Sequence, residues 1–232
     1  MFVTFEGPEG GGKTTQIKSL AGWLREQGCD VITTREPGGT RIGDGVRALL
    51  LNPDHVEMQA EAEILLFSAA RAQLVGEVIR PHLARGGVVL CDRFADSTLA
   101  YQGYGRGLDL GALRMITSFA TGNLVPDLTI CLAVPVLDGL RRKRATAAAA
   151  ASDDWNRMER EELEFHERVR TGYLELARTD GGRWWVVDAR QSVEQAQAAI
   201  RARVQQLLPN CPGDPGRRKP LVVPTTQGGA YQ

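Results

Sequence analysis

The sequence has no excess of charge of either sign. Its 232 residues include 28 Lys and Arg and 28 Asp and Glu, so the formal net charge is zero. A strongly basic chain would indicate binding to nucleic acid or to an acidic membrane surface, and that general indication is missing here. We therefore expect no nucleic-acid partner, and any positive field must be local to a site.

Cysteine is scarce, and its spacing does not suit a cross-linked or zinc-binding framework. The chain has four cysteines, which are widely separated and form no C-x-x-C pair. Cys91 and Cys131 lie inside apolar runs, where a buried strand residue is the simplest interpretation. We expect neither a disulfide framework nor a zinc site, which suits a reducing cytoplasm.

Long apolar runs are also missing. No stretch approaches the roughly 20 residues that a helix needs to cross a bilayer. No signal peptide precedes the first expected strand. We therefore expect a cytoplasmic protein with no membrane partner, long enough for one sizeable α/β domain or two small ones.

A glycine-rich stretch near the start carries the first specific pattern. Residues 2–6, FVTFE, are expected to form a buried strand, and residues 7–14, GPEGGGKT, then match G-x-x-x-x-G-K-[ST]. Glycines allow a tight turn whose N–H groups point inward and surround a phosphate chain. A glycine-rich hairpin with a stray lysine is the alternative, but the preceding strand and following helix favour a phosphate loop.

Each part of this loop has a chemical role in triphosphate binding. The Lys13 ammonium can reach the β- and γ-phosphates, and the Thr14 hydroxyl can ligate Mg²⁺. The positive end of the following helix faces the same anion. We therefore predict a nucleoside triphosphate site made by Gly7, Pro8, Glu9, Gly10, Gly11, Gly12, Lys13, Thr14 and Thr15.

Strands and helices are expected to alternate along the chain. This alternation favours an α/β fold, a five-stranded parallel sheet with helices on both faces. Pro81 is expected to kink or break the longest helix. We expect strands at 2–6, 30–34, 87–91, 127–134 and 184–187, helices at 14–27, 61–85, 110–120, 136–144, 157–178 and 192–208, a further helix carrying Arg47, and a short helix before the glycine-rich YQGYGRG within 94–107.

Two segments do not fit this alternation. Residues 145–156 include five consecutive alanines but show no apolar period, so we expect a mobile lid within about 141–160, with a helical lid as the alternative. Residues 209–232 are rich in Pro, Gly and basic residues and are expected to form a disordered tail. The folded domain is thus expected to span 1–208.

Polar clusters follow three of the expected strands. They are Glu9 to Thr15, Arg35-Glu36 and Asp92-Arg93. Ligands of open parallel sheets bind beyond the carboxyl ends of the strands, so these clusters are predicted to converge on one crevice. Asp92 is placed to hold Mg²⁺, with a helix N-cap as the alternative.

Arginines and aromatic side chains suggest a second ligand in this crevice. Arg93 can bind a second phosphate through two parallel N–H donors of its guanidinium, and Arg47 can contribute a further contact to that phosphate. Alternatively, either arginine could be a solvated surface residue. Phe67 and Arg71 share a helical face, where the aromatic ring could stack on a planar base and the guanidinium could form hydrogen bonds with its edge. The alternative is an ordinary core Phe beside a surface Arg. Hydroxyl and amide groups on one short turn could form hydrogen bonds with the base or the sugar, or could simply be the polar side chains usual in a turn. They belong to Thr98, Tyr101 and Gln102.

Basic residues flank the alanine run. Arg141 to Arg144 precede it and Arg157 follows it. An arginine that closes over a transferring phosphoryl group can contribute about 10³- to 10⁵-fold in rate, and the phosphate loop has none. The alternative is a solvated helix end that complements the helix dipole.

Taken together, these stretches resemble the bacterial thymidylate kinases, of the nucleoside-monophosphate kinase group of P-loop NTPases. The resemblance covers about residues 1–208 and predicts a cytoplasmic homodimer that transfers a phosphoryl group from ATP-Mg²⁺ to deoxythymidine monophosphate (dTMP) by direct in-line attack. TREPGGT and the DR-x-x-x-S-x-x-A-Y-Q-G pattern are its most specific parts. The matching stretches are FEGPEGGGKTT, TREPGGT, FSAAR, CDRFADSTLAYQGYGRG, PDLTICL, NR at 156–157 and FHERV at 165–169.

The resemblance also implies roles for single residues. Glu9 matches a carboxylate near the sugar 3′-hydroxyl and the acceptor, and Tyr101 matches a residue that crowds the 2′ position. Arg157 matches a lid arginine that touches the transferring group, and Arg144 is a second candidate. The remaining roles are stacking on thymine by Phe67, contact with its O4 edge by Arg71, base reading by Thr98 and Gln102, and binding of the acceptor phosphate by Arg93 and Arg47.

Two departures and two other functions stay open. The alanine run is unlike the polar lids of the family, so the closing arginine could be Arg141, Arg142, Arg144 or Arg157. The tail has no counterpart in the family. A deoxynucleoside kinase shares the phosphate loop and a D-R pair, but an uncharged acceptor would leave Arg93 and Arg47 without a phosphate. A GTP-dependent switch protein should carry an N-K-x-D stretch, which the sequence lacks.

Overall fold

A computed structural model of the chain describes residues 1–149 and 156–208. Within them, five parallel strands form one sheet in the order β2-β3-β1-β4-β5, which confirms the predicted fold class. β1 is central, and its Val3 pairs with Leu90 on one side and Leu128 on the other. The strands are β1 (Phe2–Glu6), β2 (Val31–Arg35), β3 (Val88–Asp92), β4 (Leu128–Ala133) and β5 (Trp184–Asp188).

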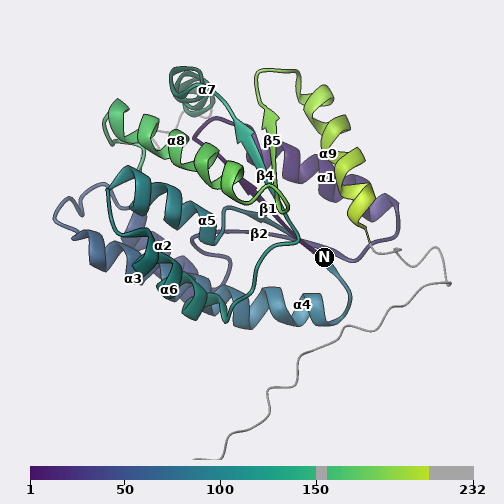
Figure 1. The fold of residues 1–232 in the computed structure, drawn as a ribbon, viewed down its shortest axis with the longest axis horizontal. Coiled ribbons are helices and arrows are strands. Elements are labelled where there is room, and N and C mark those ends of the chain that lie inside the picture. The colour runs from purple at the N-terminus through teal and green to yellow at the C-terminus, as the bar shows by residue number, and fades with distance from the viewer. Residues whose placement is uncertain (150–155, 209–232) are drawn as a thin grey trace, which may run out of the picture.

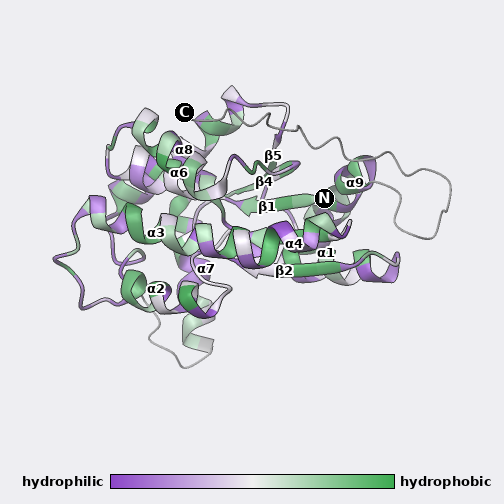
Figure 2. Cartoon of the chain, turned by 90° about the horizontal axis from the view of Figure 1, so that it is seen from below, coloured by the Kyte–Doolittle hydropathy of each residue, from purple (hydrophilic) through white to green (hydrophobic). Residues whose placement is uncertain are grey.

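Helices cover both faces of this sheet (Figure 1). Successive strand residues point to opposite faces, so Val3 and Phe5 of β1 pack with α1 (Lys13–Glu26) and α9 (Val193–Leu207), whereas Phe2 packs on the other side. The strands are mostly hydrophobic in Figure 2, as expected for a sheet buried on both faces. The second face is covered by α3 (Ala60–Leu74), α6 (Leu110–Thr121) and α8 (Leu163–Thr179).

The long helix expected over 61–85 changes its winding before Pro81. It comprises α3, a π-helical segment η1 (Val75–Ile79) and α4 (Arg80–Ala84). Proline has no N–H, and its ring would clash with the carbonyl four residues earlier in a regular α-helix. The wider π turn relieves this conflict without ending the run.

The glycine-rich YQGYGRG is helical rather than a loop. After α5 (Ala95–Thr98), the chain forms a second π-helical segment, η2 (Leu99–Gly105). An ideal Cβ on Gly105 would lie 2.7 Å from a ring carbon of Phe165 on α8. Glycine at this position therefore allows close packing of the two helices.

The segment expected to be a lid is partly helical. α7 spans Val136–Ala149, so the helical alternative holds as far as residue 149, while 150–155 and the expected tail at 209–232 lie outside the described residues. α8 begins at Leu163 rather than at 157, because the Asn156 carboxamide accepts bonds from the N–H groups of Met158 and Glu159 and holds a tight turn. α2 (Arg41–Leu51), which carries Arg47, is present as expected.

The cysteines follow the expectation with one exception. Cys91 and Cys131 are buried free thiols, but Cys29 is disulfide-bonded. Spacing argues against a framework of several bonds, and a single bond at Cys29 does not make one. Over 1–149 and 156–208, no helix has the length and apolar character that a membrane span requires.

Candidate active site

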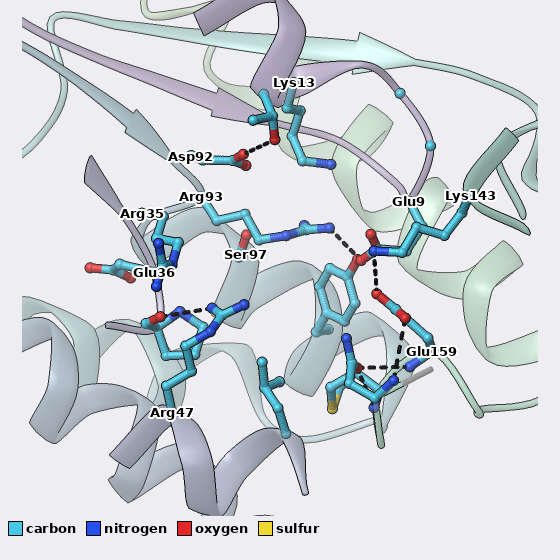
Figure 3. A pocket seen from close by; sticks show the side chains of 18 of the residues that line it. Glu9, Lys13, Arg35, Glu36, Arg47, Asp92, Arg93, Ser97, Lys143 and Glu159 are labelled. Carbon is cyan, nitrogen blue, oxygen red and sulfur yellow. Dashed lines mark hydrogen bonds and ion pairs between the residues drawn. The ribbon is translucent and has the colours of Figure 1, made fainter. Parts of the chain in front are cut away.

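The three polar clusters meet in one cavity at the carboxyl ends of the strands. The cavity encloses about 450 Å³ and is lined by the phosphate loop, by Arg35 and Glu36 after β2, and by Asp92 and Arg93 after β3 (Figure 3). This convergence confirms the predicted crevice. The structure places the following predicted site residues in its lining: Glu9, Gly10, Gly11, Gly12, Lys13, Thr14, Thr15, Arg47, Phe67, Arg71, Asp92, Arg93, Thr98, Tyr101 and Gln102.

The phosphate loop is shaped by close backbone packing. Gly7 has φ +120°, and a Cβ there would lie 2.5 Å from the Leu132 carbonyl oxygen on β4. Gly10 has φ +68°, and its Cβ would lie 2.0 Å from the carbonyl oxygen of Gly139 on α7. Any side chain at either position would push the loop off these two neighbours.

Lys13 is buried inside the loop. Its ammonium donates to the carbonyl oxygens of Gly7, at 3.0 Å, and Pro8, at 2.9 Å, and these two predicted site residues are not in the cavity lining. Burial lowers the pKa of Lys13 and the Arg93 charge lowers it further, whereas Glu9 and Asp92 act in the opposite direction. The loop therefore presents a poorly solvated cation, which suits an anionic ligand.

Thr14 and Asp92 lie together at the cavity wall. The Thr14 hydroxyl donates to the Asp92 carboxylate at 2.9 Å, although 78 residues separate them. Mg²⁺ prefers hard oxygen ligands and is usually held by one or two protein groups together with substrate phosphates and water. This oxygen pair fits that requirement.

Arg93 reaches across the cavity floor from the end of β3 (Figure 3). It is a non-glycine residue with φ +68°, a conformation that costs of order 1 kcal/mol and that its sequence gave no reason to expect. One arm of its guanidinium bonds the Glu9 carboxylate at 2.5 Å and the other bonds the Tyr173 hydroxyl at 2.9 Å. Its guanidinium also lies 4.9 Å from the Tyr101 ring centroid. These contacts hold the left-handed backbone and aim the charge into the cavity.

Glu9 is held in the charged form by its neighbours. Burial alone would raise its pKa, but the charges of Arg93 and Lys13 and a 2.9 Å bond from the Tyr101 hydroxyl lower it to about 2. A loop carboxylate thus lies near two cations in the cavity, and Tyr101 is its direct hydrogen-bond partner. The role of Glu9 beside an acceptor, which the resemblance implies, stays a prediction.

A fully buried carboxyl is linked to Arg93 through the Tyr173 hydroxyl. Glu6 ends β1 and accepts bonds from the Phe94 N–H at 2.8 Å, the Ser97 hydroxyl at 2.6 Å and the Tyr173 hydroxyl at 2.9 Å. Burial and then the charge of Asp96 raise the pKa of Glu6 to about 7. Sequence reasoning treated Glu6 only as the end of a strand. A carboxyl in an otherwise apolar run was the available signal.

Glu6 should make stability depend on pH. Its proton is held up to about pH 7 in the folded chain but only to its ordinary value of 4.5 in the unfolded chain. Between these values the unfolded state releases its proton first, so rising pH favours unfolding. We expect the free energy of unfolding of the wild type, relative to Glu6→Gln, to fall by about 3 kcal/mol from pH 4.5 to 7.5.

Denaturant titrations of both proteins across this pH range would measure the difference. Glutamine is a neutral match for the protonated carboxyl, so its own contribution should not change with pH. Glu26→Gln, at an exposed position on α1, is the matched control and should show no such trend. A constant difference between wild type and Glu6→Gln would contradict the assigned pKa.

The far end of the cavity holds the candidate base-reading groups. Arg71 is 1% exposed, so it is not the surface arginine of the alternative interpretation. It forms a buried ion pair with Glu36 at 2.7 Å and donates to the Thr98 hydroxyl at 3.0 Å. Burial raises the pKa of Glu36, although the charge of Arg71 lowers it. Phe67 and Gln102 line the same end of the cavity.

Of the candidate lid arginines, Arg142 lines the cavity, whereas Arg144 and Arg157 do not. Arg144 is absent from the lining, because Arg142, Lys143 and Thr146 form the face of α7 that meets it. Arg157 is 10% exposed, donates to the Leu50 carbonyl and pairs with Glu63 beside a smaller, second cavity. Neither arginine thus lies in the cavity in this structure, and the catalytic role of both stays a prediction.

Other groups from the same segments take their place. Lys143 pairs with Glu159 at 2.8 Å next to Glu9 (Figure 3), and its charge helps to lower the pKa of Glu9. The sequence showed a basic cluster but did not indicate which of its members faces inward. Glu159 carried no signal, because its partner is on the far side of the alanine run.

Comparisons with known proteins agree with one another. The thymidylate kinase family model matches residues 5–200. A thymidylate kinase of Roseiflexus sp. strain RS-1 is 56% identical over 214 residues, covering 90% of this chain and 95% of the relative, and one of Thermomicrobium roseum is 52% identical over 219 residues, covering 94% and 99%. The crystal structure of a thymidylate kinase from Ehrlichia chaffeensis superimposes with a TM-score of 0.69 at 32% identity, covering 88% of this chain and 98% of that one.

Proposed function

Because the chain belongs to the thymidylate kinase family, we propose that it phosphorylates dTMP, with ATP as donor, to give ADP and the diphosphate. One observation supports the assignment of this activity to the cavity: Lys13 in the phosphate loop and Arg93 beyond β3 both line it. A kinase acting on a monophosphate needs cations for two phosphate groups that face each other. We assign the activity to a domain at residues 1–208.

The donor half of the site is the phosphate loop. The loop N–H groups and Lys13 bind the β- and γ-phosphates, and Thr14 and Asp92 supply oxygens for Mg²⁺, which neutralises charge on the donor. Transfer is in line and needs no covalent enzyme intermediate, because positioning and charge stabilisation supply the catalysis. The contact between the Thr14 hydroxyl and Asp92 supports the shared metal position.

The acceptor half is built around Arg93. Its guanidinium holds the dTMP phosphate, with Arg47 of α2 adding a second grip, and Glu9 lies beside the sugar with Tyr101. At the far end, Phe67 stacks on thymine while Arg71, Thr98 and Gln102 read its edge. Support comes from the lining of the cavity, which contains all of these residues.

The lid cations are reassigned. We propose that Arg142 and Lys143 of α7, rather than Arg144 and Arg157, supply positive charge above the transferring group. Both line the cavity, and Lys143 already lies beside Glu9. These cations would compensate for a phosphate loop that has no arginine of its own.

We also propose a cytoplasmic homodimer. Leu65 of α3 is 61% exposed, and Met115 and Phe119 of the neighbouring α6 are 70% and 91% exposed. Large apolar side chains gathered on adjacent helices are typical of an interface. Sedimentation velocity should give about twice the chain mass of 25.3 kDa, and a monomer at micromolar concentration would refute the dimer. Cell fractionation would test the location.

An acceptor screen with ATP-Mg²⁺ tests the function as a whole. ADP release should be fastest with dTMP among the nucleoside monophosphates and negligible with thymidine. Faster turnover of thymidine than of dTMP would indicate a deoxynucleoside kinase. Tight GTP binding with no turnover of any monophosphate would indicate a switch protein.

A further inference from the structure

We propose that Glu63 is a positioning residue for base selection: it fixes the orientation of the Gln102 amide, so that an oxygen rather than an NH₂ group faces the acceptor base. The inference rests on the proposed function. It deepens that function by explaining how the site would separate thymine from cytosine. Glu63 itself is outside the cavity lining and acts through Gln102.

Glu63 is among the most completely paired side chains in the described residues. It is 1% exposed on α3 and accepts two bonds from Arg106, at 2.8 and 2.9 Å. Arg157 donates to its other side. The remaining bond, at 2.7 Å, comes from the Gln102 Nε2 group. The carboxylate thus ties Gln102 to two guanidinium groups behind the cavity wall.

This environment keeps Glu63 charged. Burial would raise its pKa, but the bonds and charge of Arg106, the bond from Gln102 and the charge of Arg157 together lower it. An ionised carboxylate can only accept hydrogen bonds. It therefore offers no partner for an amide oxygen.

The orientation of Gln102 follows from this chemistry. A glutamine amide can usually be turned over, because its oxygen and nitrogen differ little in shape. Beside Glu63 only the NH₂ group can face the carboxylate, so the carbonyl oxygen lies on the other branch of the amide. Gln102 lines the cavity, and within 1–149 and 156–208 the oxygen of its side-chain amide, Oε1, has no hydrogen-bond partner. An acceptor is thereby offered to the ligand.

An acceptor at this place discriminates between pyrimidines. Thymine and uracil carry an N–H at ring position 3 and can donate to it. Cytosine has a lone pair at that position, which would oppose the oxygen. A buried hydrogen bond that cannot form typically lowers binding about 10- to 100-fold. If Gln102 could turn over, its NH₂ group would satisfy cytosine and this discrimination would weaken.

The Glu63→Gln variant tests the inference. A neutral amide at residue 63 can accept or donate, so Gln102 becomes free to turn over. We expect the ratio of kcat/KM for dTMP to kcat/KM for dCMP to fall about 10-fold, mainly through KM, while the ratio for dTMP to dUMP stays constant. Glu61→Gln, exposed on the same helix, is the matched control and should keep the wild-type ratio.

A second variant is needed in case Glu63→Gln does not fold, since that change removes the carboxylate charge that pairs with two arginines. Glu63→Asp keeps the charge for Arg106 and Arg157 but withdraws it from Gln102, and it should also lower the dTMP-to-dCMP ratio. In a Gln102→Leu background, Glu63→Asp should have no further effect on that ratio.

The outcomes separate this inference from the proposed function. Equal losses for dTMP and dCMP in either Glu63 variant would show a purely structural role and overturn the inference. An effect of Glu63→Asp that persists in Gln102→Leu would also overturn it. A wild type that does not prefer dTMP to other monophosphates would overturn the proposed function instead.

Discussion

Replacing Lys13 with alanine is expected to lower kcat by at least about 10²- to 10³-fold, while the Kd for dTMP changes little. Removing a single uncharged donor to a developing oxyanion has an effect of this size, and Lys13 carries a full charge. The ammonium is buried within the phosphate loop and belongs to the donor half of the cavity, so the acceptor keeps its own contacts.

The loop should survive this change. The change removes the two bonds from Lys13 to the Gly7 and Pro8 carbonyls, but the packing of Gly7 against Leu132 and of Gly10 against Gly139 remains and holds the loop. Steady-state kinetics with ATP-Mg²⁺ and calorimetric titration with dTMP would measure the two quantities. Lys18→Ala, at an exposed position on the same helix, is the control. A Lys13→Ala enzyme with near wild-type kcat would refute the assignment.

Replacing Arg93 with alanine should affect the other substrate. We expect kcat/KM for dTMP to fall about 10²- to 10³-fold, chiefly through a higher KM, because removal of one partner from a buried charged contact has a cost of this order. Glu9 would keep Lys13 and Lys143 as compensating charges, so the loop carboxylate is not left alone.

Arg93→Lys provides the conservative comparison. It retains the charge and the side-chain restriction on a backbone with φ +68°, but it cannot bind phosphate with two parallel donors. We expect it to recover part of the loss. Arg178→Ala, 75% exposed on α8, should behave as wild type. Equal KM values for dTMP in the wild type and Arg93→Ala would exclude acceptor binding by Arg93.

The sequence predicted those parts of the site that depend on strand ends. The carboxyl ends of parallel strands share an edge, so the phosphate loop, Arg35-Glu36 and Asp92-Arg93 could be brought together from their order alone. The fold class could also be predicted, because a chain in which strands alternate with helices has few ways to pack them other than a parallel sheet covered by helices.

Residues on helices were harder to place, because a helix of uncertain winding does not specify which side chain faces inward. Residues 143 and 144 lie on different faces of α7, and the structure turns Lys143 rather than Arg144 toward the cavity. The pairing of Arg157 could not be predicted, because its partner Glu63 is 94 residues away. The linkage from Glu6 through Tyr173 to Arg93 joins three elements and leaves no trace in local spacing.

The contact between the phosphate loop and α7 limits which sequences this fold can use. The phosphate-loop pattern accepts any residue at position 10, and no pattern mentions position 139. Yet a Cβ on Gly10 would lie 2.0 Å from the Gly139 carbonyl oxygen, and a Cβ on Gly139 would lie 2.2 Å from the Glu9 carbonyl oxygen. Both clashes are with backbone atoms, so each position excludes a side chain whatever residue the other carries, and a library that varies either position, alone or together with the other, samples substitutions that the backbone cannot accommodate.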